Sequence, residues 1–220
     1  MDGALLKRSG CYFGGGTQVA LAFGEFRESR DIDFLCSSRA GFRLLRETVT
    51  ETSLGALLDK PLPLAREVRT DRDGIRTFIV ADEQKIKFEI VLEARIELSG
   101  ALDRKLGVPA LDIDCMVAEK LLANSDRGLD ASTNSRDLID LAFIVAARGA
   151  AVLAPGMHMA ESAYGTAVRR QLGLVLAKFA SEQQYAAQCA RSLGIEDTAT
   201  LKKGLALLKR LVARPTTPGP

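Results

Sequence analysis

Two aspartates one residue apart, Asp31 and Asp33, follow a glycine triplet at positions 14–16 and are the side chains best placed to do chemistry. Side chains two apart on a strand point to one side, where two carboxylates repel each other unless a cation lies between them. A bound divalent metal is the best reason for such a pair. Glycine lets a backbone approach a phosphate, with a helix N-terminus behind it. The stretch therefore predicts metal and phosphate chemistry on a nucleotide.

The same three-residue pattern occurs again at Asp112 and Asp114, without a glycine turn before it. A segment of helical character follows, so Asp112 is predicted to cap a helix and Asp114 to lie in its first turn. A pair of aspartates alone is thus weak evidence. The context of Asp31 and Asp33 carries the prediction, because the glycine turn precedes them and apolar residues surround them.

Glu89 is the candidate third carboxylate. In the predicted strand 85–92 the apolar residues alternate with Lys85, Lys87 and Glu89, which places Glu89 on the polar side. The alternative is an ordinary residue that pairs with Lys87 or Lys85, and both interpretations stay open.

The glycine triplet with Thr17 is the candidate phosphate-binding segment. The alternative is a simple tight turn. No Walker-type GK[ST] follows the triplet, and the GxGxxG fingerprint is absent from it. The two commonest nucleotide-binding patterns are therefore excluded here.

Three charged residues in the second half fall on apolar helical stripes. Lys120 shares a helical face with apolar neighbours, and Asp137 and Asp140 share one with Leu141. Charges on such stripes suggest that they point into a cleft between the two halves of the chain.

The alternative for these acids is structural. Asn134 or Ser135 could cap the helix, with the acid after them in its first turn. Asp140 could pair with Arg136 or Arg127. The sequence does not decide between the two interpretations.

Composition bounds the class of protein. The chain has 220 residues, is 47% hydrophobic and carries a formal net charge of +2, so no global excess of charge indicates a nucleic-acid binder. Its cysteines are widely spaced and fit reduced thiols. The sequence offers no targeting signal and no membrane span, so we expect a cytoplasmic protein.

The elements that position these residues indicate an α+β fold. Strands are predicted at 10–13, 30–35, 65–69, 75–81 and 85–92, with an Asp-Gly hairpin turn at 71–74, and helices at 2–9, 17–26 and 40–51. From Asp112 the chain reads as helices. We therefore expect a mixed-sheet core with flanking helices over residues 1–108, a helical domain over 109–213 that completes the cleft, and a disordered tail over 214–220.

A basic amphipathic segment covers residues 201–214. We favour a helix packed on its domain, with its charges in solvent. The alternative is a surface that contacts RNA. The role of residues 150–212 as a whole stays open.

Taken together, these motifs resemble the AbiEii/AbiGii-type nucleotidyltransferase toxins, with their MenA-like relatives, in the DNA polymerase β-like superfamily. The resemblance covers residues 10–145 and rests on the glycine turn with its following aspartates, on Lys87-x-Glu89, on Glu119-Lys120-Leu121 and on RDLIDL at 136–141.

The resemblance implies a nucleotidyltransferase core with a helical C-terminal domain, and transfer of a nucleoside monophosphate from an NTP with release of pyrophosphate. It implies these roles: Asp31 and Asp33 as catalytic metal ligands for Mg²⁺ or Mn²⁺, Glu89 as third ligand, Gly15, Gly16, Thr17, Lys87 and Arg136 at the nucleotide, Lys120 at a phosphate, and Asp137 as catalytic acid.

Relatives act as toxins of toxin–antitoxin or phage-defence pairs, and some modify tRNA 3′ ends. The resemblance therefore implies an antitoxin partner and a tRNA acceptor. The alternatives are transfer to a small molecule or a protein hydroxyl, and a non-catalytic binding protein of the same fold.

Overall fold

The structure, a computed structural model, describes residues 1–213 and contains two compact units. Unit 1 comprises Met1–Gln18 and Ser29–Cys115; unit 2 comprises Val19–Glu28 and the chain from Met116 on. The expected boundary near residue 108 falls inside unit 1, because strand β7 (Val108–Leu111) pairs within its sheet. The predicted tail 214–220 lies outside the described residues.

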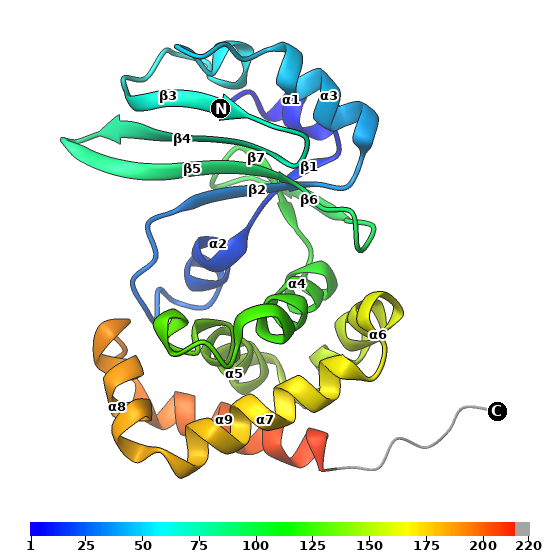
Figure 1. Cartoon of the computed structure of the whole chain (residues 1–220), viewed down its shortest axis with the longest axis vertical. Helices are drawn as coiled ribbons and strands as arrows, with labels where there is room; N and C mark the ends of the chain where they lie inside the picture. The colour runs from blue at the N-terminus through cyan, green and yellow to red at the C-terminus, as the bar shows by residue number, and fades with distance from the viewer. Residues whose placement is uncertain (214–220) are drawn as a thin grey trace. The chain divides into compact units, whose positions relative to one another are not determined.

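Within residues 1–213, seven strands form one mixed sheet in unit 1 (Figure 1). They are β1 (Cys11–Gly14), β2 (Ile32–Cys36), β3 (Leu64–Thr70), β4 (Gly74–Ala81), β5 (Gln84–Leu92), β6 (Gly100–Asp103) and β7. Their order is β3-β4-β5-β2-β1-β7-β6, with β2–β5 and β1–β7 parallel and the other pairs antiparallel. The predicted α+β class with a mixed sheet is confirmed.

One face of this sheet carries the core of unit 1. Helices α1 (Gly3–Arg8) and α3 (Arg39–Glu47) cover it, as Figure 1 shows. The alternation of β5 explains the arrangement, because Phe88 and Ile90 point into the core and Lys87 and Glu89 point to the opposite face. The polar residues of the candidate site thus share the face that α1 and α3 leave open.

Two predicted elements differ from the observed ones, and two observed strands were not predicted. Helix α2 (Gly15–Ala22) begins inside the glycine triplet and ends before Gly24 and Glu25, which both have positive φ. Strand β2 begins at Ile32, so Asp31 immediately precedes the strand. Strands β6 and β7 were not predicted, because each has four residues and Pro109 suggested a break.

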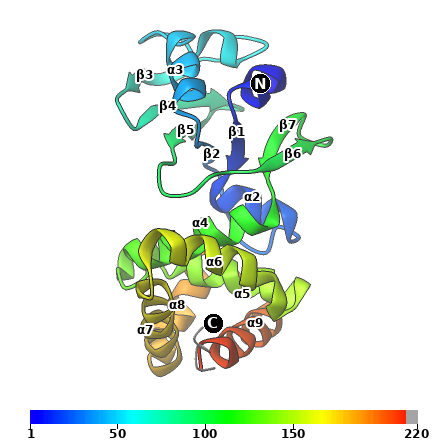
Figure 2. The same cartoon turned by 90° about the vertical axis from the view of Figure 1, so that its right-hand side faces the viewer.

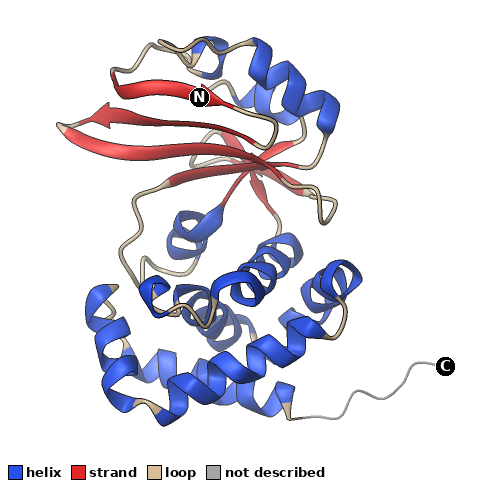
Figure 3. Cartoon of the chain, in the orientation of Figure 1, coloured by secondary structure: helices blue, strands red, loops and turns tan. Residues whose placement is uncertain are grey.

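In the described part of unit 2 the regular elements are helices, joined by short loops (Figure 3). After α4 (Ile113–Arg127), which begins in unit 1, come α5 (Arg136–Arg148), α6 (Leu153–Tyr164), α7 (Ala167–Ser181), α8 (Gln183–Ser192) and α9 (Thr198–Val212), shown from a second side in Figure 2. Helix α5 is buried from Asp137 to Ala146. Helix α9 packs closely on it, since a Cβ at Gly204 would lie 2.0 Å from the carbonyl oxygen of Ala142.

The segment Val19–Glu28 belongs to unit 2 through specific contacts. The Phe26 ring stacks on Phe143 with centroids 3.8 Å apart, and the Glu28 amide donates to the carbonyl oxygen of Leu193 at 3.0 Å. None of the helices in residues 1–213 combines the length and apolarity that crossing a membrane requires.

Candidate active site

Asp33 lies in the middle of the polar face of the sheet. It is the register partner of Gly14 on β1 and of Glu89 on β5. Register partners on neighbouring strands share a face. The structure therefore brings the predicted residues Asp33 and Glu89 side by side, next to the glycine turn, although they are far apart in sequence.

Gly15 packs directly against this aspartate. Its φ is +70°, and a Cβ at this position would lie 2.4 Å from Oδ2 of Asp33. Both the backbone conformation and the contact require glycine. The first turn of α2, whose amides lack partners within the helix, thus starts beside a carboxylate. A phosphate accepted by these amides would lie close to a metal held by the acid.

Thr17 fixes the backbone at the other predicted acid. Its hydroxyl donates to the carbonyl oxygen of Asp31 at 2.5 Å and lies 2.9 Å from Oγ of Ser29. These bonds connect α2 to the segment that leads into β2. The Thr17 hydroxyl therefore has a structural partner, and its predicted phosphate contact stays a prediction, as does that of Gly16.

The Glu89 carboxylate is held by two cations. Nζ of Lys87 lies 2.5 Å from Oε2, and Nε of Arg76 lies 3.3 Å from Oε1. Arg76 also donates to Oδ2 of Asp71 at 2.7 Å. The pairing of Glu89 with Lys87, one of the two interpretations of the sequence, is confirmed. Arg76 was missed, although the Asp-Gly hairpin gives the signal, since its register places Arg76 opposite Glu89.

The carboxylates of the candidate site suit a metal ion that binds together with a nucleotide. Among residues 1–213, no three His, Cys, Asp or Glu side chains are grouped closely enough to hold an ion by themselves. Mg²⁺ is commonly bound by one or two carboxylates, with waters and substrate phosphates completing its shell. Asp31 and Asp33, whose role as ligands stays a prediction, would supply that number. Glu89 would have to leave Lys87 and Arg76 to become a third ligand.

The predicted charges of the helical half form a buried network in unit 2. Nζ of Lys120 lies 3.1 Å from Oδ1 of Asp137 and 2.7 Å from Oδ2 of Asp140. Nε of Arg127 lies 2.8 Å from Oδ2 of Asp137, and Nε of Arg27 lies 2.6 Å from Oδ1 of Asp140. The side chains of Lys120, Asp137 and Asp140 are 6%, 2% and 0% exposed. Opposite charges thus compensate one another in the interior of the unit.

The network gives Asp140 partners that the sequence did not offer. Asp140 pairs with Arg27 and Lys120, and Arg127, one of the alternatives considered for Asp140, pairs with Asp137. Arg27 lies 113 residues from Asp140 in sequence, so helical spacing could not reveal the pair.

The same charges shift two pKa values. Burial alone would raise the pKa of Asp137, but Lys120 and Arg127 outweigh it and hold that pKa well below its usual range. Burial alone would lower the pKa of Lys120, but Asp140 and Asp137 reverse this and raise it. Lys120 and Asp137 are therefore charged near neutral pH. Catalytic roles for them, and a nucleotide contact for the half-buried Arg136, stay predictions.

The second Asp-x-Asp pattern has the predicted structural role. Oδ1 of Asp112 accepts from the amide of Cys115 at 2.9 Å, and Asp114 lies in the first turn of α4. Oδ2 of Asp112 also accepts from the hydroxyl of Ser99. Asp112 thus caps the helix and Asp114 lies in its first turn, so the pattern alone does not define a site.

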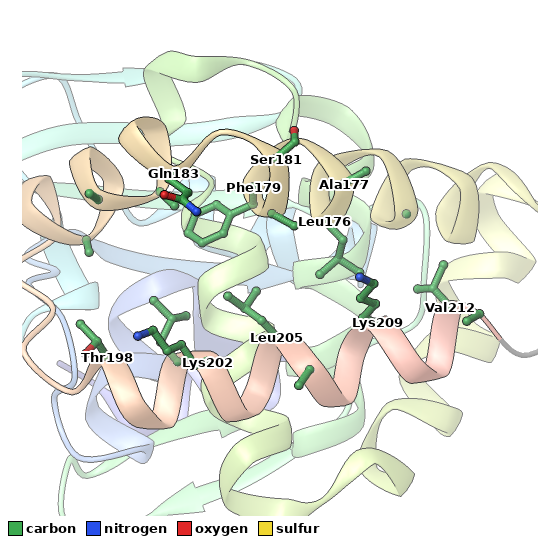
Figure 4. A pocket seen from close by; sticks show the side chains of 18 residues that line it. Leu176, Ala177, Phe179, Ser181, Gln183, Thr198, Lys202, Leu205, Lys209 and Val212 are labelled. Atoms are coloured by element: carbon green, nitrogen blue, oxygen red, sulfur yellow. The ribbon is translucent and has the colours of Figure 1, made fainter.

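An apolar groove of about 1030 Å³ lies between α7, α8 and α9 of unit 2 (Figure 4). Its lining includes the apolar side chains of Leu176, Phe179 and Leu205 and the basic side chains of Lys202 and Lys209. None of the predicted site residues lines it. The chemistry-bearing side chains are on the sheet face and in the buried network, so we do not assign the candidate site to this groove.

The fold has counterparts among solved structures. Two crystal structures from Helicobacter pylori share the fold: a protein described as a candidate nucleotidyltransferase (TM-score 0.56, 15% identity, 96% of this chain and 89% of that chain covered) and JHP933 (TM-score 0.54, 15% identity, 96% and 86% covered). No curated protein is similar enough to count as a match.

A family model, "Nucleotidyl transferase AbiEii toxin, Type IV TA system", matches residues 3–205. The chain therefore belongs to the AbiEii nucleotidyltransferase toxin family, as the resemblance predicted.

Proposed function

We propose that this member of the family uses a divalent metal to transfer a nucleoside monophosphate from an NTP to an acceptor hydroxyl, with release of pyrophosphate. The observation that carries the proposal is the contact between the glycine turn at Gly15 and the carboxylate of Asp33. It puts helix N-terminal amides, which suit a phosphate, next to an acid that suits a metal.

Asp31 and Asp33 would hold Mg²⁺ or Mn²⁺. Glu89 would become a third ligand if its ion pairs with Lys87 and Arg76 opened. A metal bound there would supply activation of the acceptor hydroxyl and neutralisation of charge on the phosphates. The amides of Gly15, Gly16 and Thr17 would orient the triphosphate. Catalysis of this kind depends mainly on positioning and on electrostatic stabilisation.

Basic residues would compensate the negative charge that develops on the phosphates. We assign Lys87 and Arg136 to the nucleotide, and Lys120 to a phosphate. Asp137 would be the catalytic acidic residue of the second half and would act as a carboxylate. The buried network supports these last two roles only indirectly, since it keeps Lys120 and Asp137 charged and fixes their positions.

We further propose that the acceptor is the 3′ end of a tRNA and that the chain acts as the toxin of a pair with a cognate antitoxin. The support is the family, which is that of type IV toxin–antitoxin systems. Transfer to a small molecule or to a protein hydroxyl would use the same site with another acceptor.

The test is to incubate the protein with Mg²⁺ and each α-labelled NTP, together with tRNA, protein lysate or small-molecule acceptors in separate reactions. We expect label on tRNA with wild type and none with Asp33→Asn. The matched control is Asp114→Asn, the same substitution in the helix-capping pattern, which should transfer label like wild type. Equal transfer by wild type and Asp33→Asn would overturn the proposal, and label on another acceptor class would overturn the tRNA assignment.

A further inference from the structure

The polar face of β3, β4 and β5 carries a row of basic side chains that leads to Asp33. Register pairs Arg69 with Arg76, Arg76 with Glu89, and Glu89 with Asp33. These residues therefore follow one another across four adjacent strands on one face.

A second row runs beside it. Arg66 pairs with Phe78, Phe78 with Lys87, and Val80 with Lys85. The Arg66 guanidinium lies over the Phe78 ring, 4.9 Å from its centroid, which confirms that Arg66 is on this face. The basic residues of the two rows, Arg66, Arg69, Arg76, Lys85 and Lys87, are called the basic strip below.

The strip is accessible to a ligand. Arg66, Arg69 and Lys85 are exposed, and the side chains of Arg76 and Lys87 are 31% and 39% exposed. Arg76 and Lys87 are paired with acids, whereas Arg66 stacks on the partly buried Phe78. A basic surface with an aromatic side chain among its cations is typical of sites for single-stranded nucleic acid, where the cations contact the phosphates and planar groups stack on the bases.

We propose that the basic strip binds the phosphate backbone of a nucleic-acid acceptor and guides its end to Asp33. The inference rests on the proposed nucleotidyl transfer and specifies its acceptor surface. Three inter-strand steps separate Arg69 from Asp33, or about 14 Å. This distance spans about four nucleotides at the phosphate spacing of one strand in a duplex, about 3.4 Å. The strip thus suits a polynucleotide rather than a single NTP.

Protection of a sheet edge does not account for the strip. Charged side chains often cover an edge strand and prevent pairing with another sheet, and β3 is such an edge. Arg76, Lys85 and Lys87, however, are on β4 and β5, which have partners on both sides. Their charges lie on the face of the sheet, where a bound chain could contact them.

The test compares two triple variants of the full chain in binding a fluorescein-labelled single-stranded RNA, followed by anisotropy. The strip variant is Arg66→Ala/Arg69→Ala/Lys85→Ala, which leaves the predicted site residues intact. The control, Lys202→Ala/Lys209→Ala/Arg210→Ala, removes the same charge from α9, the basic helix for which an RNA contact was the alternative interpretation of the sequence. Circular dichroism confirms that both fold.

We expect the Kd for RNA to rise about tenfold or more in the strip variant, and the salt dependence of log K to fall by about 2, or about 0.7 for each lost phosphate contact. The control should bind like wild type. Loss of RNA binding in the control with retention in the strip variant would overturn the proposal and place the contact on α9.

Binding of labelled NTP with Mg²⁺ tests whether the strip contacts the phosphates of RNA or those of the nucleotide substrate. The strip variant should bind NTP like wild type, and a loss of NTP binding equal to the loss of RNA binding would show that the strip serves the triphosphate instead.

The results distinguish a failure of the proposed RNA surface from a failure of the proposed nucleotidyl transfer. If wild type binds RNA through the strip but transfers no nucleotide, the proposed transfer is refuted and the RNA surface stands. If the strip variant transfers nucleotide to RNA as fast as wild type does, the RNA surface alone is refuted.

Discussion

Gly15 and Asp33 are in such close contact that the smallest side chain at position 15 would collide with the carboxylate, 2.4 Å from its Oδ2. Gly15 also has a φ of +70°, a conformation that residues with a Cβ rarely adopt. The glycine turn and the candidate metal ligand are therefore one structural unit.

We expect Gly15→Ala to abolish nucleotidyl transfer, because the methyl group must displace Asp33. The strained backbone should also cost about 1–2 kcal/mol of stability. Thermal melts measure the second effect, and label transfer from an α-labelled NTP measures the first.

The matched control for this variant is Gly107→Ala. Gly107 has a φ of +72°, and a Cβ at this position would meet no atom of the described chain within 4 Å apart from its immediate neighbours. Both variants should lose stability through the strained backbone, Gly15→Ala by the larger amount because of its clash with Asp33, and only Gly15→Ala should lose transfer. Retained transfer in Gly15→Ala would contradict the assignment of the site.

Glu89→Gln tests whether this residue is a metal ligand or holds its two cations. Lys87 and Arg76 already pair with the Glu89 carboxylate. We therefore expect Glu89→Gln to raise the Mg²⁺ concentration for half-maximal transfer by less than about fivefold. Asp33→Asn should lose transfer at all Mg²⁺ concentrations. A Mg²⁺ titration of the transfer rate measures this. A loss in Glu89→Gln as complete as in Asp33→Asn would show that Glu89 is an essential ligand.

Lys120→Met should destabilise the protein by about 3–5 kcal/mol, because it leaves Asp137 and Asp140 buried without a shared cation. Urea denaturation measures the loss. Lys203→Met is the control in the same unit, where Nζ donates to the carbonyl oxygen of Ala146 at 3.0 Å, and it should cost about 1 kcal/mol. Comparable losses in the two variants would show that the network contributes little.

Acid should destabilise the protein through Asp137. Its folded-state pKa is depressed, so its contribution to stability is present above the unfolded pKa of about 3.9 and is lost as pH falls below it. The free energy of unfolding, measured by denaturation between about pH 6 and about pH 3, should fall more steeply in wild type than in Asp137→Asn. Identical slopes would mean that Asp137 does not carry the effect.

The sheet shows why part of the fold follows from local sequence. The strand β5 was predictable because strict alternation marks its two faces, and the turn at Asp71–Gly74 because Asp-Gly favours a hairpin. Strands β6 and β7 were not, since four residues carry too little periodic signal and their pairing with each other and with β1 supplies the stability.

The sequence by itself determined the α+β class, the glycine turn with its aspartates, and the helix-capping role of Asp112, because each depends on residues close together in the chain. Only the tertiary structure decided that Asp33 lies beside Glu89, that Arg76 holds Glu89, and that Arg27 reaches Asp140. The reason is physical: strand register and helix packing bring together charges from distant segments, and spacing along one element cannot encode such pairs.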